Sequence, residues 1–261
     1  MRGLGIGRGL CLLGVCLLLL GAPGCDIDGA KPVELDTSEE SRGLILQALR
    51  ARADQATAFR AYGKSWHGIV NDDGKTETFG FNARLWFRPP LSLRLQSHAT
   101  MHGNIDLGCN NEEFWLGIKP QISTYYWGRW DRALTEGLLP FNPKVVLEAI
   151  GIVEVGEEDS WDLAEDDEML VLSRADPNTE VTKRVFIDAR AQKIKRIIYT
   201  DGDGTPLVTA QLSGYRRVSN DFDIPTVIRI TALENGEPTG WIKLVVEPIR
   251  AGKVDEYIFD R

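Results

Sequence analysis

Three histidines, His67, His98 and His102, are the residues of this chain whose type best suits acid–base or metal chemistry. His98 and His102 lie four positions apart, so they share a face on a strand or on a helix, which is compatible with metal ligation. No cysteine or acid completes a ligand set beside them in the sequence, and His98 falls on a polar strand face with Arg94. We interpret them as solvated strand histidines and expect neither a metal nor a cofactor.

Other chemical motifs are weak. Cys109 has no histidine nearby in DLGCNNEEFW, which favours a buried structural thiol over a nucleophile. TDGDGTP has two aspartates at a calcium-loop-like spacing, but it lacks the glutamate tail of an EF-hand loop, so we expect a hairpin turn. The acidic run from Glu157 to Glu168 is interpreted as a solvated loop. Because no hydrolase, zinc-protease, P-loop or dinucleotide-binding fingerprint occurs, we predict that the protein is not an enzyme.

Charge argues against nucleic acid as a partner. The 261 residues carry a net charge of −8, and 43% of them are hydrophobic. Residues 1–24 contain two arginines and no acid, so the remainder carries −10. Such a chain is a poor match for phosphate backbones, which are bound by cationic surfaces.

The N-terminus has the three-part layout of a secretory signal. Arg2 and Arg8 precede an apolar run from Leu10 to Leu20, and small residues follow at 21–24. The stretch LLLLGAPGC resembles the lipobox of bacterial lipoproteins, which implies cleavage before Cys25 and attachment of lipid to that cysteine. A plain secretory signal and an uncleaved anchor are the alternatives.

The expected domain plan follows from this signal. Residues 1–24 would be a lipoprotein signal peptide, residues 25–36 a tether, and residues 37–261 a single domain. Cys11 and Cys16 would leave with the signal, so no disulfide is expected within the mature domain. We expect the protein in the bacterial cell envelope, anchored to a membrane and facing the periplasm, with inner and outer membrane both open.

Two helices are expected. Apolar residues recur at helical spacing over 37–62, with Thr37 or Ser38 as the cap, Gly43 as the weak point and Gly63 as the end. A shorter helix is predicted in PFNPKVVLEAIGI, where Asn142 is the cap and proline takes the first position.

Between and after these helices the hydrophobic period is two, which predicts strands. Expected strands cover the two arms of SWHGIVNDDGKTETFGFNARLWF and 91–101, 112–118, 122–128, 169–174, 181–188, 193–200, 207–217, 226–234 and 241–248. This indicates a mainly β domain: a large curved antiparallel sheet of about ten or eleven strands, covered by a long N-terminal helix and a short mid-chain helix. Such a sheet either closes on itself or leaves a cavity beneath the helices.

The order of these elements resembles the LolA/LolB-like superfamily of lipoprotein carriers. The resemblance is carried by FNARLWFRPPLSLRL, NNEEFWLGI, STYYWG and the FNPKVVLEAIGI helix. It implies an incomplete β-barrel with the helices as a lid over an apolar cavity for acyl chains.

We therefore predict a lipid-anchored envelope lipoprotein whose cavity binds acyl chains or the lipid moieties of lipoproteins, as a carrier or sorting protein. The expected cavity wall is formed by Phe79, Phe81, Leu85, Phe87, Leu93, Leu95, Phe114 and Leu116. The alternative is a non-enzymatic interaction or assembly lipoprotein with a filled core. In that case the aromatic run Tyr125, Tyr126, Trp127 and Trp130 would dock an envelope protein, although the same run also fits ordinary sheet packing.

Overall fold

A computed structural model describes residues 35–71, 73–99, 103–119, 124–129, 142–177 and 179–260. These residues belong to one compact unit that spans 34–261. Cys25, the expected signal peptide and most of the expected tether lie outside the described residues, as do His102 and Trp130. In the described part of the chain, no helix is both long and apolar enough to cross a membrane.

The elements follow one another along the chain from helix to strands. Their bounds are α1 (Glu39–Asp54), β1 (Phe59–Val70), β2 (Thr76–Arg88), β3 (Ser92–Ala99), β4 (Gly103–Cys109), β5 (Glu113–Lys119), β6 (Thr124–Arg129), α2 (Pro143–Ala149), η2 (Glu158–Ser160), β7 (Asp162–Asp166), β8 (Met169–Ala175), β9 (Thr182–Asp188), β10 (Lys193–Thr200), β11 (Pro206–Ser213), β12 (Arg216–Arg217), β13 (Asp223–Ile224), β14 (Val227–Glu234), β15 (Glu237–Ala251) and η3 (Glu256–Phe259).

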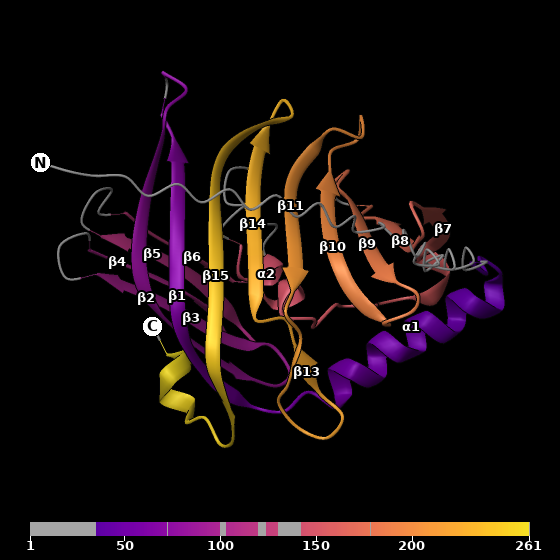
Figure 1. Cartoon of the computed structure of the whole chain (residues 1–261), viewed down its shortest axis with the longest axis horizontal. Coiled ribbons are helices and arrows are strands. Elements are labelled where there is room, and N and C mark those ends of the chain that lie inside the picture. Colours follow the sequence, from indigo (N-terminus) through magenta and orange to yellow (C-terminus); the bar gives the residue numbers. More distant parts are fainter. Residues whose placement is uncertain are drawn as a thin grey trace, which may run out of the picture. The chain divides into compact units, whose positions relative to one another are not determined.

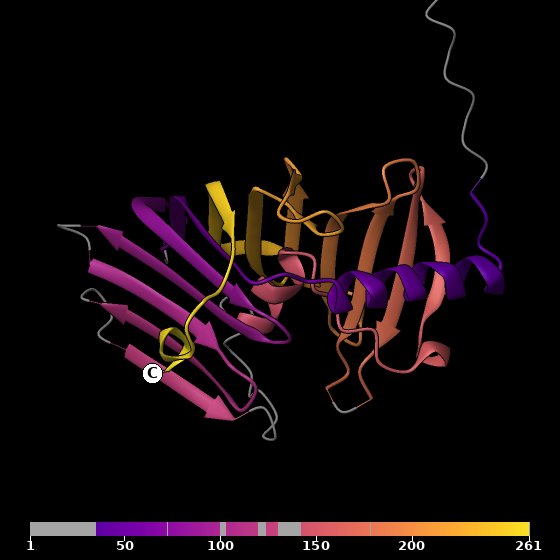
Figure 2. The same cartoon turned by 90° about the horizontal axis from the view of Figure 1, so that it is seen from below.

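One antiparallel sheet dominates the fold (Figure 1). Within the described residues it has thirteen strands in the order β6-β5-β4-β3-β2-β1-β15-β14-β11-β10-β9-β8-β7, and β12 and β13 form a separate pair. Strands β6 and β7 are the two ends of this order, so the sheet is not closed into a barrel. Helix α2 contacts both β4 and β11, which are six places apart in the sheet. The sheet therefore bends around α2, as Figure 2 shows.

The predicted fold class, a mainly β domain with a large curved sheet and two helices, is confirmed. The strand count was too low, because β4, β7 and β13 were not expected and the predicted strand 207–217 is divided into β11 and β12. The β4 sequence, GNIDLGC, has glycines at both ends of a short apolar pattern, and it is recognised as a strand only through its pairing with β3 and β5.

The first helix is shorter than expected. It begins after Ser38, whose Oγ accepts a hydrogen bond from the Ser41 backbone N–H (3.2 Å), and it ends at Asp54. The prediction that it extends to residue 62 and stops at Gly63 is wrong, because residues 59–70 form β1. Phe59 is fully buried there and packs on Phe87, with 5.5 Å between the ring centroids. Pairing with both β2 and β15 outweighs the local helical pattern.

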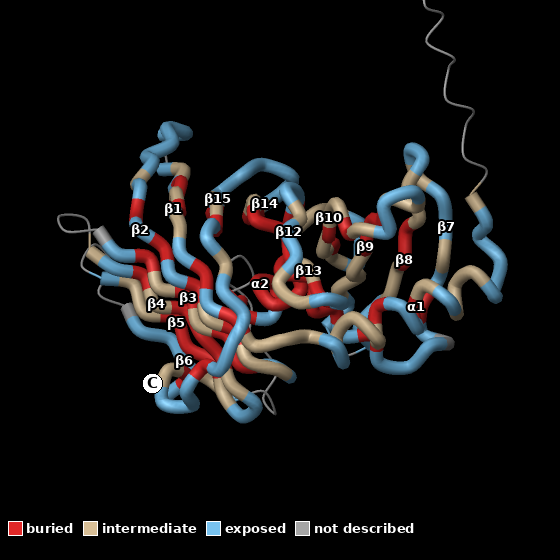
Figure 3. Tube along the Cα trace, turned by 60° about the horizontal axis from the view of Figure 1, so that its bottom comes forward, coloured by how far each residue is buried: buried red, intermediate tan, exposed pale blue. Residues whose placement is uncertain are grey.

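The second helix is found where it was predicted. Asn142 caps α2 by accepting a hydrogen bond from the Lys144 backbone N–H at 2.9 Å, and Pro143 occupies the first turn. Almost every residue of α2 is buried, because the helix lies in the hollow of the sheet (Figures 2 and 3). Helix α1 lies on the same side, across the end of the sheet formed by β7 to β10 (Figure 2).

Candidate ligand-binding site

The predicted cavity wall is one continuous apolar face. Strand register places Phe87 beside Leu93 and Leu85 beside Leu95, and it continues through β4 to Phe114 and Leu116. Six of the eight residues join the main core cluster: Leu85, Phe87, Leu93, Leu95, Phe114 and Leu116. Their exposed fractions are 0–7%, and α2 residues such as Val145 and Leu147 belong to the same cluster.

Phe79 and Phe81 lie further along β2, beyond that cluster. Phe81 is buried and meets the His67 ring edge-on at 4.9 Å, whereas Phe79 is half-buried and pairs with His67 across the strands. None of the eight predicted wall residues lines the two cavities described next. Whether their face receives a ligand stays a prediction.

An apolar cavity of about 270 Å³ lies between α1 and the strands β8 to β10. The helix contributes Leu44, Ile45, Ala48 and Leu49, and the sheet contributes Leu170, Ile187 and Ile194. Leu44 is 59% exposed, whereas Leu49 is buried. Leu49, Ile187 and Ile194 also belong to the main core cluster, so the cavity adjoins the same core as the predicted wall.

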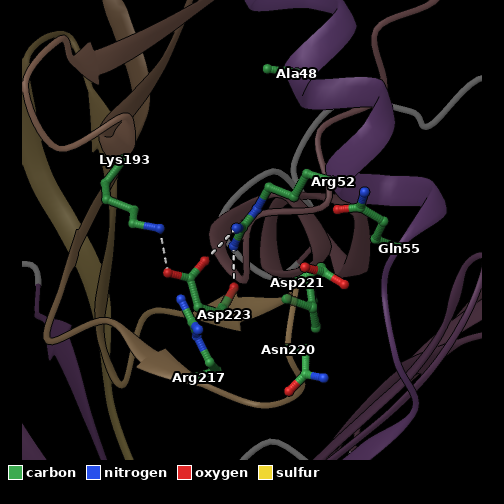
Figure 4. Close-up of a pocket in the computed structure, with 9 residues that line it drawn as sticks. Ala48, Arg52, Gln55, Lys193, Arg217, Asn220, Asp221 and Asp223 are labelled. Carbon is green, nitrogen blue, oxygen red and sulfur yellow. Dashed lines mark hydrogen bonds and ion pairs between the residues drawn. The ribbon is translucent and has the colours of Figure 1, made fainter.

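A second cavity, of about 290 Å³, adjoins the first and is polar (Figure 4). The two cavities share Ala48, Arg52 and Lys193. The polar cavity is further lined by Gln55, Arg217, Asn220, Asp221, Phe222 and Asp223. An apolar compartment therefore leads directly into one that carries cationic groups from α1, β10 and β12.

Asp223 organises these cations. Arg52 Nη1 lies 2.5 Å from Asp223 Oδ1, and Lys193 Nζ bonds the other carboxylate oxygen. Burial alone would raise the pKa of Asp223, but the hydrogen bonds from Lys193 and Arg52 outweigh burial and hold the pKa below its ordinary value. Arg52 Nε also donates to the Gly151 carbonyl at 3.0 Å. These contacts tie α1 to β10, to β13 and to the segment after α2.

A second polar network fixes α2. The Glu148 side chain is 2% exposed and receives hydrogen bonds from Lys183 Nζ (2.7 Å) and from the Tyr199 hydroxyl. Burial, together with the neighbouring carboxylate, raises the pKa of Tyr199 well above its ordinary value. Both partners of Glu148 are thus donors, and this network holds the helix against β9 and β10.

The residues considered for chemistry differ in their environments where they are described. His98 is exposed, and the described residues contain no group of three or more His, Cys, Asp or Glu side chains that would hold a metal. His67 is buried, its Nε2 lies 3.1 Å from Ser65 Oγ, and desolvation lowers its pKa to about 4. Cys109 is a buried thiol, as predicted, and burial raises its pKa to about 12.

The structure also assigns the acidic and aromatic stretches to particular turns and strands. In TDGDGTP the Asp201 N–H donates to the Thr205 carbonyl at 3.0 Å, which confirms the hairpin turn. Part of the acidic run from Glu157 forms η2 and β7 in place of a loop. Tyr125, Tyr126 and Trp127 are 49%, 43% and 54% exposed on β6, an end strand of the sheet.

The fold of this chain is similar to the folds of several solved structures. A putative outer membrane lipoprotein-sorting protein domain from Vibrio parahaemolyticus superposes with a TM-score of 0.56 at 14% identity, covering 85% of this chain and 97% of that chain. A LolA superfamily protein from Nitrosomonas europaea gives 0.54 at 10% identity, covering 84% and 97%. The fold is LolA-like. A DUF1329 family protein from Desulfovibrio piger gives 0.54 at 12% identity, covering 87% and 98%.

At these identities the likeness establishes the LolA-like fold alone. No family model matches the sequence, and no curated protein matches it either. The resemblance stated from the order of elements is therefore confirmed at the level of fold.

Sequence reasoning expected a cavity beneath the helices of this LolA-like fold but missed the residues that line the two cavities beneath α1. The helical spacing of Leu44, Ile45, Ala48 and Leu49 was a usable signal, because it predicted which side of α1 faces the sheet. The residues opposite come from strands more than a hundred positions later, and nothing local in the sequence connects them to α1.

Proposed function

We propose that this protein is a non-enzymatic, lipid-anchored envelope protein that binds acyl chains beneath α1. The observation that carries the proposal is the apolar cavity between α1 and β8–β10, which ends at Arg52 and Lys193. An acyl chain in the apolar part would gain about 0.8 kcal/mol for each buried CH₂ group. Arg52, Lys193 and Arg217 outnumber Asp221 and Asp223 in the polar cavity, so its net positive charge suits the carboxylate or phosphate group of an amphiphile.

The predicted wall on β2, β3 and β5 is proposed as the deeper part of the same binding surface. Its residues belong to the core cluster that also contains Leu49, Ile187 and Ile194. A chain longer than the cavity of about 270 Å³ reaches Leu85, Phe87 and Leu95 if α1 or α2 moves away from the sheet. The LolA-like fold of the neighbours supports a carrier or sorting role, which belongs to this proposal.

The test is direct binding of a fluorescent fatty acid to residues 26–261, which retain every described element. The wild-type chain is expected to bind, and Ala48→Trp is expected to weaken binding at least tenfold, because the indole enters both cavities. Gln47→Trp is the matched control, since Gln47 is the exposed neighbour on α1 and lines neither cavity. If the wild-type chain does not bind the fatty acid, the proposed function is wrong. If Ala48→Trp binds as tightly as Gln47→Trp, the acyl chain does not occupy the cavity beneath α1.

Lipidation at Cys25 is proposed from the lipobox-like stretch. Cys25→Ser is expected to abolish incorporation of labelled palmitate into the full-length precursor. Cys109→Ser is the matched control, because that thiol is buried in the domain. Labelling that survives in Cys25→Ser would refute the anchor.

A second candidate function is an interaction or assembly lipoprotein with a filled core. The exposed aromatics Tyr125, Tyr126 and Trp127 favour it, because three large side chains gather on an end strand of the sheet. A photo-cross-linker at position 127 that captures a single envelope protein, in a chain that binds no fatty acid, would favour this function over acyl binding.

A further inference from the structure

The side of the sheet that faces away from α2 is called the outer face here. Figure 1 looks onto it at β15, β14 and β11, with α2 behind the strands. On β1 the outward residues alternate with buried Phe59, Ala61 and Ser65. The outward side chains of the central strands include Arg60, Tyr62, Lys64, Trp66, Arg84, Trp86, Lys243, Trp241, Arg229, Gln211 and Arg196.

Strand register arranges these side chains in rows. Trp66 lies beside Lys243, Lys243 beside Arg229, Arg229 beside Gln211, and Gln211 beside Arg196. Neighbouring strands are about 4.8 Å apart, so this row across β1, β15, β14, β11 and β10 is roughly 19 Å long. A shorter row joins Tyr62, Arg84 and Gln96 across β1, β2 and β3. The outer face is therefore a broad surface and not a groove.

Acidic residues are absent from the centre of this surface, and Asp106 on β4, which is opposite Gln96 at the end of the shorter row, is paired with Arg94. No Asp or Glu occurs at any position of 60–66, 80–86, 196–198, 209–213, 227–231 or 241–245, in a chain whose net charge is −8. By contrast, the cations that contact the inner elements, Arg52, Lys183 and Lys193, are each paired with an acid. Among the described residues, no acid lies within ion-pair distance of Arg60, Arg84 or Lys243, and all three are exposed. The centre of the outer face of this acidic protein therefore carries cations without an ion-pair partner among the described residues.

Aromatic rings lie between the cations. Arg229 stands over the Trp241 ring at 4.5 Å and Lys243 over the Trp66 ring at 5.8 Å. Arg196 stands over Phe186 at 3.9 Å, and its buried Nε has no hydrogen-bond partner. Trp66, Trp86 and Trp241 are half-buried, and Tyr62 is 38% exposed. Tryptophan and tyrosine with a partly wet ring are typical of the headgroup zone of a bilayer.

We propose that the outer face docks on a membrane surface rich in anionic phospholipid. Guanidinium groups match phosphate oxygens in geometry as well as charge, and four of the outward cations are arginines. A protein partner is less suitable, because protein interfaces are depleted of charge at their centre, whereas here the charges occupy the centre. The outer face is on the opposite side of the sheet from the cavities beneath α1, so this proposal does not depend on acyl binding.

Vesicle co-sedimentation tests the proposal with residues 26–261, which removes any contribution of an N-terminal anchor. Vesicles of phosphatidylcholine alone are compared with vesicles containing 30 mol% phosphatidylglycerol, about one anionic lipid in three. The wild-type chain is expected to bind only the anionic vesicles, and less as salt rises. A cation near such a surface contributes about a five-fold change in affinity, so Arg60→Gln/Arg84→Gln/Lys243→Gln is expected to bind roughly 100-fold more weakly.

The matched control loses the same charge elsewhere. Lys75, Arg216 and Lys253 are exposed and lie in turns or in the small β12–β13 pair, so Lys75→Gln/Arg216→Gln/Lys253→Gln is expected to lower affinity less than three-fold. Equal losses in both triple variants, or wild-type affinity in the outer-face variant, would overturn the proposal. So would binding to phosphatidylcholine alone, or binding to an acidic protein without binding to vesicles. Circular dichroism and an unchanged midpoint of urea denaturation establish that each variant is folded.

Discussion

Arg52 on α1 and Asp223 on β13 form an ion pair in which Nη1 and Oδ1 are 2.5 Å apart and each side chain is only 17% exposed. The two residues are separated by 171 positions in the sequence. The pair closes the polar end of the space beneath α1 and, with Lys193, fixes the helix to the sheet. The stability of the domain and access to the cavity are therefore expected to depend on the same carboxylate.

Replacing that carboxylate is the first prediction. Asp223→Asn is expected to lower the free energy of unfolding by about 2 kcal/mol, because charge-assisted hydrogen bonds are lost and two cations remain mostly buried. Urea denaturation at neutral pH measures the change. Asp221→Asn, in the same segment but exposed, is the control and is expected to change stability by less than about 0.5 kcal/mol.

Acid weakens the same contact. The folded pKa of Asp223 is lowered, so the pair contributes fully above the unfolded pKa of 3.8 and its contribution is lost as pH falls through the folded pKa. The stability difference between the wild-type chain and Asp223→Asn should therefore shrink below pH 3.8. A difference that stays constant down to pH 2 would contradict this assignment.

The burial of His67 leads to a second prediction about how stability depends on pH. Burial lowers its pKa from 6.5 to about 4, so between these values the unfolded chain binds a proton that the folded chain does not. Stability should therefore fall as pH decreases from 6.5 to about 4, by about 3 kcal/mol from this residue. His67→Leu should remove this component when unfolding is measured in urea at pH 7.5 and pH 4.5. If the variant and the wild-type chain lose equal stability, the assignment is wrong.

Two glycines should respond to alanine in opposite directions. A Cβ atom at Gly43 on α1 meets nothing within 4 Å, so Gly43→Ala should stabilise the protein by about 1 kcal/mol through helix propensity. A Cβ atom at Gly63 on β1 would lie 1.9 Å from the Val245 carbonyl oxygen, so Gly63→Ala should destabilise by about 2 kcal/mol or more. Thermal unfolding of the two variants side by side measures both effects. Equal shifts would show that β1 and β15 are not packed as described.

Cys109 should be chemically silent in the folded protein. Its pKa of about 12 and its full burial leave almost no accessible thiolate at neutral pH. In residues 26–261 it is the only thiol, so a thiol reagent reports on it alone. We expect no reaction in buffer and one equivalent in 6 M guanidinium chloride. Rapid reaction of the native protein would mean that β3 and β4 open locally.

The sequence was informative wherever local periodicity decides the structure. The alternation Phe81, Leu85, Phe87 identified the inward face of β2, and the cap at Asn142 located α2. Residues 59–62 were assigned to the wrong element, because the aromatic Phe59 continues the helical spacing yet is buried by strands from both ends of the chain. The same limit applies to the site, because Arg52 and Asp223 are 171 positions apart and no local pattern predicts their contact.

The pairing of β1 with β15 has a consequence for how the protein matures. The first strand and the last long strand are neighbours at the middle of the sheet, and every other large-sheet strand lies on one side or the other of that seam. Until residues 237–251 are synthesised or translocated, β15 is missing and the remaining strands form two separate sheets. Each sheet then has an edge strand, β1 or β14, with unpaired backbone N–H and C=O groups. The domain is completed in a single late step, so a premature stop or a C-terminal cut before β15 would leave two aggregation-prone halves instead of a slightly shortened protein.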